Sequence, residues 1–494
     1  MPRTADRTAR RLAKLIDLRE RGIDPYPARA KRTHTAAQAI AAFEGATGGK
    51  ERVAIVAGRV MSIRVMGKSA FAHIADGSGR LQLYVRQDVV GLDGYDLFRG
   101  RTDLGDFVEA EGSLFRTRTG EITLQVKSFR LLAKAMRPLP EKWHGLKDVE
   151  TRYRQRYLDL IANERVRNIF VTRTGIVSAL RRFLDARGFL EVETPILQPL
   201  YGGAAARPFT TYHNALDRTL YLRIADELYL KRLIIGGFDR VYEIGHNFRN
   251  EGISTSHNPE FTMLEVYQAY GDYHEMMDLV EQMYWAVAKE TLGSPVIIYG
   301  GNEIDLTPPW RRVTMRAAIM EHSGIDIEAH PTHESLAAAV SERGLLASKQ
   351  LTWGKLVDQL FEKHVQATLV QPAFVLDYPV EVSPLAKKKR DAPHLTERFE
   401  YFIGGLECGN AFTELNDPIE QRERFEAQVR ASQAGDQESH PLDEDFLIAL
   451  EHGMPPTGGL GIGIDRMVML FTDQSNIREV ILFPQLRSKQ QAQV

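Results

Sequence analysis

Five short segments of alternating polar and apolar residues lie between residues 51 and 130, and they constrain the fold more than any other feature of the chain. "VAIVAGRV", "SAFAHIA" and "RLQLYV" predict three strands, the last two joined by the turn "DGSG". "VVGLDGYDLFRG" predicts a short helix, and "FVEAEGSLF" and "EITLQVK" predict two further strands separated by the turn "TRTG". Three strands, a helix and two strands is the order of a five-stranded OB-fold barrel, a fold that commonly binds oligonucleotides.

The pattern changes after this barrel. "AKAMRPLPEKWHG" has two prolines and no period, so it predicts a linker. Beyond it, helices and strands are interspersed as in one large α+β domain, with helices at about 164–187 and 272–291 and strands at 373–380 and 397–415. We therefore expect four parts: a basic helical extension at 1–50, the OB-fold domain at 51–135, a linker at 136–150, and an α+β domain at 151–494 with a partly helical insertion at about 309–367.

Composition excludes several classes of protein. The chain of 494 residues is 43% hydrophobic and 26% charged, which is typical of a soluble globular protein with a large core. No apolar run approaches the roughly 18 residues that span a bilayer, so we expect no membrane contact. The only cysteine, Cys408, excludes an intrachain disulfide and a thiolate zinc site, and it favours a reducing cytoplasm.

The first 32 residues carry most of the positive charge. Ten Lys and Arg residues stand there against four Asp and Glu residues, a net charge of +6, whereas the whole chain has −2. Leu12, Leu15 and Ile16 have helical spacing, so an amphipathic helix is predicted. Its basic face is either simply solvated or in electrostatic contact with nucleic acid. Its four acids argue against an import presequence.

The segment "NFRNEGISTSHNPEF", residues 247–261, contains more charge and aromatic character than a simple connection needs. A strand "YEIGHNFRNE" would place Arg249 and Glu251 on one face, because side chains alternate along a strand. The return strand "PEFTMLEVYQAY" would place Phe261, Glu265 and Tyr267 together on its own face. We expect one polar and aromatic surface; the alternative is an ion pair within an ordinary sheet.

A second hairpin, "ERFEYFIGGLECGNAFTEL" at 397–415, turns at two glycines and places Glu400 and Glu407 on the same face. Two close carboxylates repel each other unless a cation such as Mg²⁺, bridged to phosphates, neutralises them; otherwise they are solvent-facing acids. Asn410, Phe412 and Glu414 share a face of opposite parity to Glu407. A bulge at Cys408–Gly409 would bring both sets to one pocket.

The glycine-rich segment "GGLGIGIDR" near the end lacks the spacing of a dinucleotide fingerprint and has no βαβ unit after it. We expect its glycines to let the backbone approach a flat ligand, with Arg466 at the start of the following helix. The sequence shows no convincing nucleophile–base pair and no HExxH or CxxC zinc motif. Arginines, paired carboxylates and an aromatic plane indicate nucleotide chemistry by positioning.

These elements resemble motifs 2 and 3 of the class II aminoacyl-tRNA synthetases, and "GFLEVETPILQP", with Pro195, resembles motif 1 of that class. "RYRQRYLDL", "GGAAARPF", "ADELYLKRL" and "NFRNEGIS…HNPEFTMLE" together resemble the lysyl-tRNA synthetases, bacterial type, from about residue 51 to 485. The resemblance implies an antiparallel catalytic sheet flanked by helices. It implies activation of L-lysine by ATP to lysyl-adenylate and transfer to the 3′ end of tRNA(Lys), in a cytoplasmic homodimer.

The resemblance also implies residue roles at the nucleotide. Arg249 and Arg466 are the implied catalytic residues: Arg249 would bind the α-phosphate and the lysine carboxylate, and Arg466 would stack on the adenine. The implied ATP-binding residues are Arg249, Glu251, His257, Asn258, Phe261 and Arg466. Glu400 and Glu407 would hold Mg²⁺, with more than one ion expected.

At the amino acid, Gly203 and Glu227 would take the α-amino group and Asn410 the carboxylate side. Glu265, Tyr267 and Glu414 would receive the ε-ammonium, with Phe412 packing on the methylene stem. In the barrel, the positions implied for reading the anticodon are Arg64, Phe71, Gln82 and Glu121. From the residues alone, Phe71 could equally belong to the barrel core and Arg64 to the surface.

Three rival functions remain to be distinguished. A relative that lysylates a protein or a lipid is disfavoured by the barrel and by the lack of a membrane span. A catalytically silent RNA-binding protein would be expected to have lost pocket residues. An aspartyl or asparaginyl synthetase is disfavoured because Glu265 and Glu414 would repel an anionic side chain. His246 and the ending "FPQLRSKQ" depart from the usual family pattern.

Overall fold

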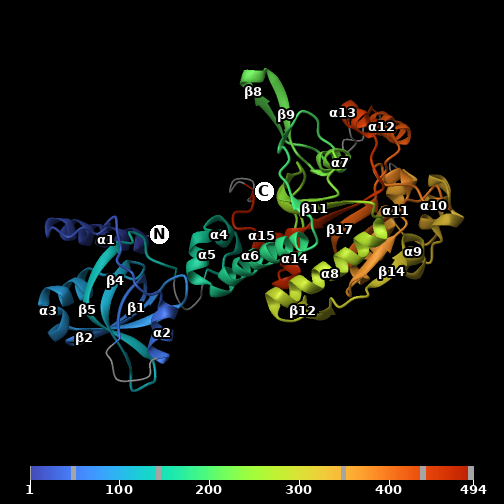
Figure 1. The fold of residues 1–494 in the computed structure, drawn as a ribbon. Coiled ribbons are helices and arrows are strands. Elements are labelled where there is room, and N and C mark those ends of the chain that lie inside the picture. Colours follow the sequence, from blue (N-terminus) through green and yellow to red (C-terminus); the bar gives the residue numbers. More distant parts are fainter. Residues whose placement is uncertain (1, 46–51, 141–145, 346–351, 434–440, 488–494) are drawn as a thin grey trace. The chain divides into compact units, whose positions relative to one another are not determined.

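The computed structural model describes residues 2–45, 52–140, 146–345, 352–433 and 441–487 (Figure 1). Their contacts divide the chain into two compact units, Met1–Lys147 and Asp148–Val494. Among the described residues, no helix combines the length and apolar content needed to cross a membrane. Part of the predicted linker, residues 141–145, and the last residues of the ending "FPQLRSKQ" lie outside the described ranges.

The first unit is built on a closed barrel in the order β1-β2-β3-β5-β4, so the five predicted strands are confirmed. They are β1 (Val53–Met66), β2 (Ser69–Ala75), β3 (Arg80–Arg86), β4 (Phe107–Arg116) and β5 (Ile122–Ala133). Between β3 and β4 lie α3 (Gln87–Asp96) and the π-helical turn η1 (Leu97–Arg101). Strands β4 and β5 approach so closely at Gly112 that a Cβ there would lie 2.0 Å from the Gln125 carbonyl oxygen.

Two helices, α1 (Pro2–Glu20) and α2 (Ala36–Glu44), precede the barrel. The predicted helix at the basic end is present, but its apolar face is not the predicted one. Leu12 and Ile16 are each 48% exposed, whereas Leu15 and Leu18 are buried. Leu15 and Leu18 are three residues apart and therefore lie on the same, buried face of the helix. Of the three residues expected on the apolar face, only Leu15 is buried.

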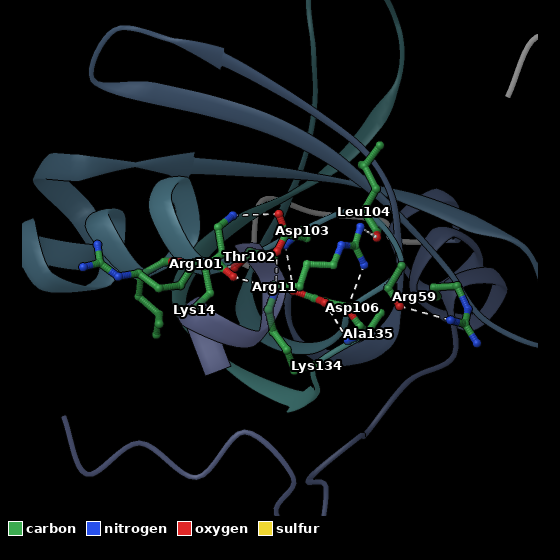
Figure 2. Close-up of polar contacts among 12 residues, drawn as sticks. Arg11, Lys14, Arg59, Arg101, Thr102, Asp103, Leu104, Asp106, Lys134 and Ala135 are labelled. Atoms are coloured by element: carbon green, nitrogen blue, oxygen red, sulfur yellow. Dashed lines mark hydrogen bonds and ion pairs between the residues drawn. The ribbon is translucent and has the colours of Figure 1, made fainter. Parts of the chain in front are cut away.

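The buried face of α1 also carries a cation. Arg11 donates to the carbonyl oxygens of Ala135 at 2.7 Å and Leu104 at 2.8 Å (Figure 2). Beside it, the fully buried Lys134 ammonium contacts Asp106 at 2.7 Å. Part of the positive charge of this segment therefore fixes α1 on the barrel, and it is not available to an external partner.

The second unit contains an eight-stranded sheet in the order β14-β15-β16-β17-β18-β11-β10-β6. The pairs β14–β15 and β10–β6 are parallel and the others are antiparallel. Its strands are β6 (Leu190–Glu191), β10 (Arg240–Phe248), β11 (Glu260–Ala269), β14 (Arg311–Thr314), β15 (Ala373–Leu376), β16 (Arg398–Ile403), β17 (Leu406–Thr413) and β18 (Thr457–Gly463).

Helices α6 (Glu164–Asp185), α8 (Tyr273–Leu292) and α14 (Ile464–Phe471) pack with Leu264 and Val266 of β11 in the main core. The other helices are α4 (Val149–Arg154), α5 (Arg156–Ala162), α7 (Glu227–Ile235), α9 (Met315–Ser323), α10 (His333–Glu342), α11 (Trp353–His364), α12 (Pro418–Gln433), α13 (Glu444–Glu451) and α15 (Ile477–Val480). Short 3-10 turns are η2 (Asn214–Leu216), η3 (Ile327–Ala329), η4 (Gln366–Thr368) and η5 (Val380–Val382). Smaller sheets contain β7 (Leu197–Gln198), β8 (Thr210–His213), β9 (Arg218–Leu222), β12 (Val296–Tyr299) and β13 (Asn302–Asp305).

The predicted strand through Glu251 is too long, because β10 ends at Phe248. The Arg249 N–H still donates a hydrogen bond across the hairpin, to the Pro259 carbonyl at 2.9 Å. The N–H of Asn250 instead donates to the carbonyl of Arg207, which lies outside the hairpin. Arg249 and Glu251 therefore lie on a loop, and strand alternation does not place them. In "GFLEVETPILQP", the segment that resembles motif 1, the structure forms only two short strands, Leu190–Glu191 and Leu197–Gln198.

Candidate functional site

A cavity of about 340 Å³ lies on the face of the large sheet away from α6 and α8, and the first turn of α14 contributes Arg466 to its lining. Side chains alternate along β11, so Leu264 and Val266 enter the core while Glu265 and Tyr267 line the cavity. A volume of this size suits a small-molecule ligand. The predicted residues that line it are Gly203, Glu227, Arg249, Glu251, His257, Asn258, Phe261, Glu265, Tyr267, Glu400, Glu407, Asn410, Phe412 and Arg466.

A β-bulge brings the two sets of residues on β17 to this cavity. Glu407 pairs with Phe402 and Gly409 pairs with Tyr401, so Cys408 is the extra residue. The bulge predicted at Cys408–Gly409 is confirmed, and it changes the parity of the strand between Glu407 and Asn410.

One end of the cavity, lined by Glu227 and Glu265, is acidic. Glu414 is fully buried and does not line the cavity itself; it lies beneath Gly459. A Cβ at Gly459 would fall 1.8 Å from Glu414 Oε1 and 2.7 Å from the Tyr267 ring. Glycine at this position therefore leaves the room that these two side chains occupy.

The acidic end holds one internal cation. The buried Lys231 ammonium contacts Glu227 at 2.5 Å and also contacts Glu414. Burial lowers the pKa of Lys231, but the two carboxylates outweigh it and the net shift is upward. Lys231 is therefore charged, and part of the acidic charge is neutralised without any ligand.

One ammonium does not balance all the acids at this end. Burial raises the pKa of Glu265 well above its ordinary value, and the neighbouring Asp226 raises it further. Burial likewise raises the pKa of Glu414 well above its ordinary value, although Lys231 acts against this shift. The Tyr267 hydroxyl donates to Glu265 at 3.1 Å. An ammonium entering the cavity at this end would supply the missing charge.

The other end of the cavity is formed by arginines. The Arg249 guanidinium lies 5.1 Å from the centre of the Phe261 ring, and its buried Nε has no hydrogen-bond partner among the described residues. Burial lowers the pKa of Arg249. The Asn258 Oδ1 is also buried and without a partner in the described parts of the chain. Such atoms are expected where a bound ligand completes the hydrogen bonds.

Arg466 lies at the same end. Its guanidinium is 3.1 Å from the Glu407 carboxylate, and it approaches His257 Nε2 at 3.3 Å. Burial and the charge of Arg466 lower the pKa of His257, so this side chain is neutral at pH 7. A neutral imidazole can donate one hydrogen bond to a phosphate oxygen without adding charge.

Glu400 and Glu407 form the carboxylate pair expected from the sequence. Burial, and then the charge of Glu407, raise the pKa of Glu400 to about 7. Burial raises the pKa of Glu407, but the charges of Arg466, Arg249 and Arg398 together outweigh it, so the net shift is downward. The described residues contain no group of three or more metal-ligating side chains. The pair therefore fits a divalent cation only if phosphates and water complete its shell, as Mg²⁺ commonly requires.

Sequence reasoning missed three charged residues of this site: Asp226, Lys231 and Arg398. Arg398 lines the cavity and contacts Glu400 at 2.7 Å and Asn410 at 3.0 Å. It precedes Glu400 by two residues on the same strand face, and Lys231 follows Glu227 by four residues on one helix. Both spacings were available as signals of paired charges.

The barrel carries the four residues that the resemblance implies for the anticodon. Phe71 is half-buried on the outer face of β2, where it stacks on Tyr84 with ring centres 4.6 Å apart, so the alternative that it belongs to the barrel core is wrong. Arg64 is its exposed cross-strand neighbour. Gln82 donates to Glu121 at 2.7 Å. This face combines an aromatic surface with polar groups, as single-stranded nucleic acid binding requires.

His246, the departure nearest the cavity, does not line it. Its Nδ1 lies 2.9 Å from Glu260, and both side chains are exposed.

Comparison with known proteins gives the same assignment for both units. Residues 148–487 match the family described as tRNA synthetases class II (D, K and N), and residues 54–132 match the OB-fold nucleic acid binding domain. The chain is 57% identical over 484 residues to a lysine–tRNA ligase of Chloroflexus aurantiacus, covering 98% of this chain and 99% of that relative. It is 58% identical to that of Roseiflexus castenholzii, with 97% and 98% covered, and 52% identical to that of Bacillus subtilis, with 96% of each covered. The chain therefore belongs to the lysine–tRNA ligase family of class II tRNA synthetases.

Proposed function

We propose that this chain joins L-lysine to tRNA(Lys) at the expense of ATP. In the first step a lysine carboxylate oxygen bonds to the α-phosphorus of ATP, and the bond to pyrophosphate breaks. In the second step a hydroxyl at the 3′ end of the tRNA bonds to the lysyl carbonyl carbon, and AMP leaves. The observation that carries this proposal is the buried excess of carboxylates at one end of a cavity whose other end is formed by arginines.

The first step needs positioning and charge stabilisation. The lysine carboxylate is ionised at pH 7, so it needs no general base to attack. The partnerless Nε of Arg249 is available to bind the α-phosphate or that carboxylate, and Phe261 beside it offers a plane for the adenine. Arg466 would complete the adenine site by stacking on the face of the base opposite Phe261. Donors fixed before the reaction stabilise charge as it develops, with no cost of reorganisation.

We further propose that Glu400 and Glu407 hold Mg²⁺. The fit rests on position, because both carboxylates line the cavity beside the arginines, where a triphosphate would lie. When bound, Mg²⁺ would neutralise the phosphate oxygens and help to orient the triphosphate. Glu251 and Asn258 would bind the adenine, and His257 would bind the distal phosphates.

Selection of lysine would follow from the acidic end. Glu227 and Gly203 would bind the α-amino group, and Asn410, held by Arg398, would bind the carboxylate side. Glu265, Tyr267 and Glu414 would receive the ε-ammonium over Phe412. A substrate without that charge leaves buried acids unpaired, which can cost on the order of 10⁴-fold, whereas removal of one methylene costs only about 10–200-fold. Ornithine is therefore the difficult competitor.

For tRNA binding we propose the outer face of the barrel, with Phe71 stacking on an anticodon base. Arg64, Gln82 and Glu121 would read base edges, since stacking alone does not discriminate between bases. We further propose that the chain has four parts. They are the basic extension at 1–50, the OB-fold domain at 51–135, the linker at 136–150 and the catalytic domain at 151–494.

We also propose a homodimer in a reducing cytoplasm. The single buried cysteine supports the compartment. Exposed apolar residues in and around the segment that resembles motif 1 support the dimer, because large apolar side chains left exposed within one short segment are typical of an interface. They are Leu190, Ile196, Leu197 and Leu200, each at least 40% exposed.

ATP–pyrophosphate exchange tests the activation step. We expect exchange that requires lysine, and charging of a tRNA transcript with a UUU anticodon that depends on the same amino acid. Exchange supported by aspartate or asparagine, with none supported by lysine, would overturn the proposal. Ornithine tests the length of the site, and norleucine tests its need for charge.

A further inference from the structure

Arg398 of β16 lies in the wall of the cavity, next to Asn410 of the neighbouring strand β17. Glu400 pairs directly with Asn410 across the two strands, and Arg398 lies two residues before Glu400, so the three side chains share the cavity face. The Nε of Arg398 donates to the Oδ1 of Asn410 at 3.0 Å. The guanidinium and the amide are therefore bonded to each other within the cavity wall.

The chemistry of the two groups sets the direction of this hydrogen bond. A guanidinium has donors only, whereas the amide of asparagine has an accepting oxygen and a donating nitrogen. The oxygen of Asn410 must therefore face Arg398. The Nδ2 of Asn410 is left over, and no acceptor for it lies among the described residues.

We propose that Arg398 is a positioning residue that orients the Asn410 amide, so that a donor and not an acceptor meets the carboxylate of the amino acid. The inference rests on the proposed function, in which Asn410 binds that carboxylate. A reversed amide would place its oxygen against the negative carboxylate and its N–H groups against the donors of Arg398. Both contacts would be repulsive, so the orientation of the amide decides whether Asn410 attracts or repels the ligand.

The guanidinium of Arg398 is itself held on its other sides. Its Nη1 donates to the Val382 carbonyl at 2.7 Å and to the Ser383 Oγ at 3.0 Å. Its Nη2 donates to Glu400 at 2.7 Å, and the guanidinium carbon lies 4.6 Å from the centre of the Tyr378 ring. These contacts need no ligand, so the amide is oriented before the amino acid binds. A group that is fixed in advance loses less entropy on binding.

An alternative is that Arg398 acts by its charge alone, which attracts a carboxylate through space. The two explanations differ in how the effect of Arg398 depends on Asn410. If Arg398 acts through the amide, removal of the amide also removes the effect of Arg398. If it acts by charge, its effect remains. A double-mutant cycle separates the two explanations.

Isothermal titration calorimetry of the full chain with L-lysine and with L-lysinamide, without ATP or metal, tests the inference. Both ligands have the two amino groups, but only L-lysine has the carboxylate. The ratio of their dissociation constants therefore isolates the carboxylate from general changes in the site. A hydrogen bond to a charged group changes affinity by about tenfold or more, so Arg398→Met and Asn410→Ala should each lower the preference for L-lysine by about this factor. The double variant should lower it no further than the larger of the two single changes.

Arg424→Met is the matched control. Arg424 is also buried and donates to the Ser383 carbonyl at 2.8 Å, in the segment that holds Arg398, but it does not line the cavity. It should leave the ratio of the two dissociation constants unchanged. The different α-amino pKa values of the two ligands are common to all the proteins compared.

Three results would overturn the inference. The two single losses multiply in the double variant, or Arg424→Met lowers the preference for L-lysine as much as Arg398→Met does. The third is a wild-type ratio in Asn410→Ala, which does not depend on whether Arg398→Met folds. If the wild type binds L-lysine and supports lysine-dependent pyrophosphate exchange, these results leave the proposed function standing. A wild type that neither binds L-lysine nor supports the exchange removes both.

Discussion

Replacement of Lys231 by methionine removes the only ammonium described between Glu227 and Glu414 while keeping a side chain of similar length. Both carboxylates are less than 9% exposed, so water cannot replace the lost cation. Removal of one partner from a buried ion pair typically costs about 3–5 kcal/mol of unfolding free energy. We expect Lys231→Met to lose an amount in this range at pH 8.

The loss should depend on pH, and its sign follows from the acids. Burial raises the pKa of Glu227 and Glu414 in the folded protein above their unfolded values. The folded state therefore holds protons more strongly than the unfolded state, and stability is lost as pH rises through the folded pKa values. Without Lys231 these pKa values rise further, so the variant should be closer to the wild type at pH 6 than at pH 8.

Equilibrium urea unfolding at pH 6 and pH 8 measures both effects. Arg182→Met is the control, because Arg182 of α6 pairs with Glu290 and the two side chains are 60% and 49% exposed. Its cost should be about 0–1 kcal/mol. Lys231→Met with Glu414→Gln should recover part of the loss. The reasoning is refuted if Lys231→Met costs no more than Arg182→Met, or if its cost is the same at both pH values.

Other variants test the remaining assignments. Glu265→Gln should raise the KM for lysine by about 30-fold or more, because a buried charge loses its partner, while the KM for ATP changes little in pyrophosphate exchange; equal changes in both would contradict this. Arg249→Ala should lower the single-turnover rate of adenylate formation by about 10²-fold or more, and a normal rate would exclude its contact with the α-phosphate. Phe71→Ala should weaken tRNA binding by about 1–3 kcal/mol in filter binding, whereas Leu92→Ala, at an exposed position of the same unit, should not.

Local periodicity predicted the parts of the site that lie on regular strands. Phe261, Glu265 and Tyr267 alternate on β11, and all three line the cavity. The bulge at Cys408 was also predictable, because two sets of polar residues of opposite parity flank a glycine. The hairpins β2–β3 and β4–β5 followed from turn residues at short spacing, whereas the closure of the barrel through the parallel pair β3–β5 did not.

Features that depend on distant contacts were not predictable from such patterns. The end of β10 is set by a bond from Asn250 to the carbonyl of Arg207, far from the hairpin in sequence. The buried face of α1 is set by the carbonyl groups that accept hydrogen bonds from Arg11. The helical period of the sequence does not reveal such contacts. Asp226 was missed for the same reason: only the folded chain brings it to Asn247 of β10, which donates to it at 3.2 Å.

The charge balance of the acidic end also affects which amino acid the cavity selects, in a family described as tRNA synthetases class II (D, K and N). Lys231 neutralises part of the acidic charge, so the empty cavity is less negative than its acids alone suggest. Glu265 lines the cavity and has no ion-pair partner among the described residues, so an ammonium can still be bound there. An aspartate side chain would instead place a further negative charge beside these buried acids, and like charges disfavour each other. This balance of charge therefore favours lysine over aspartate.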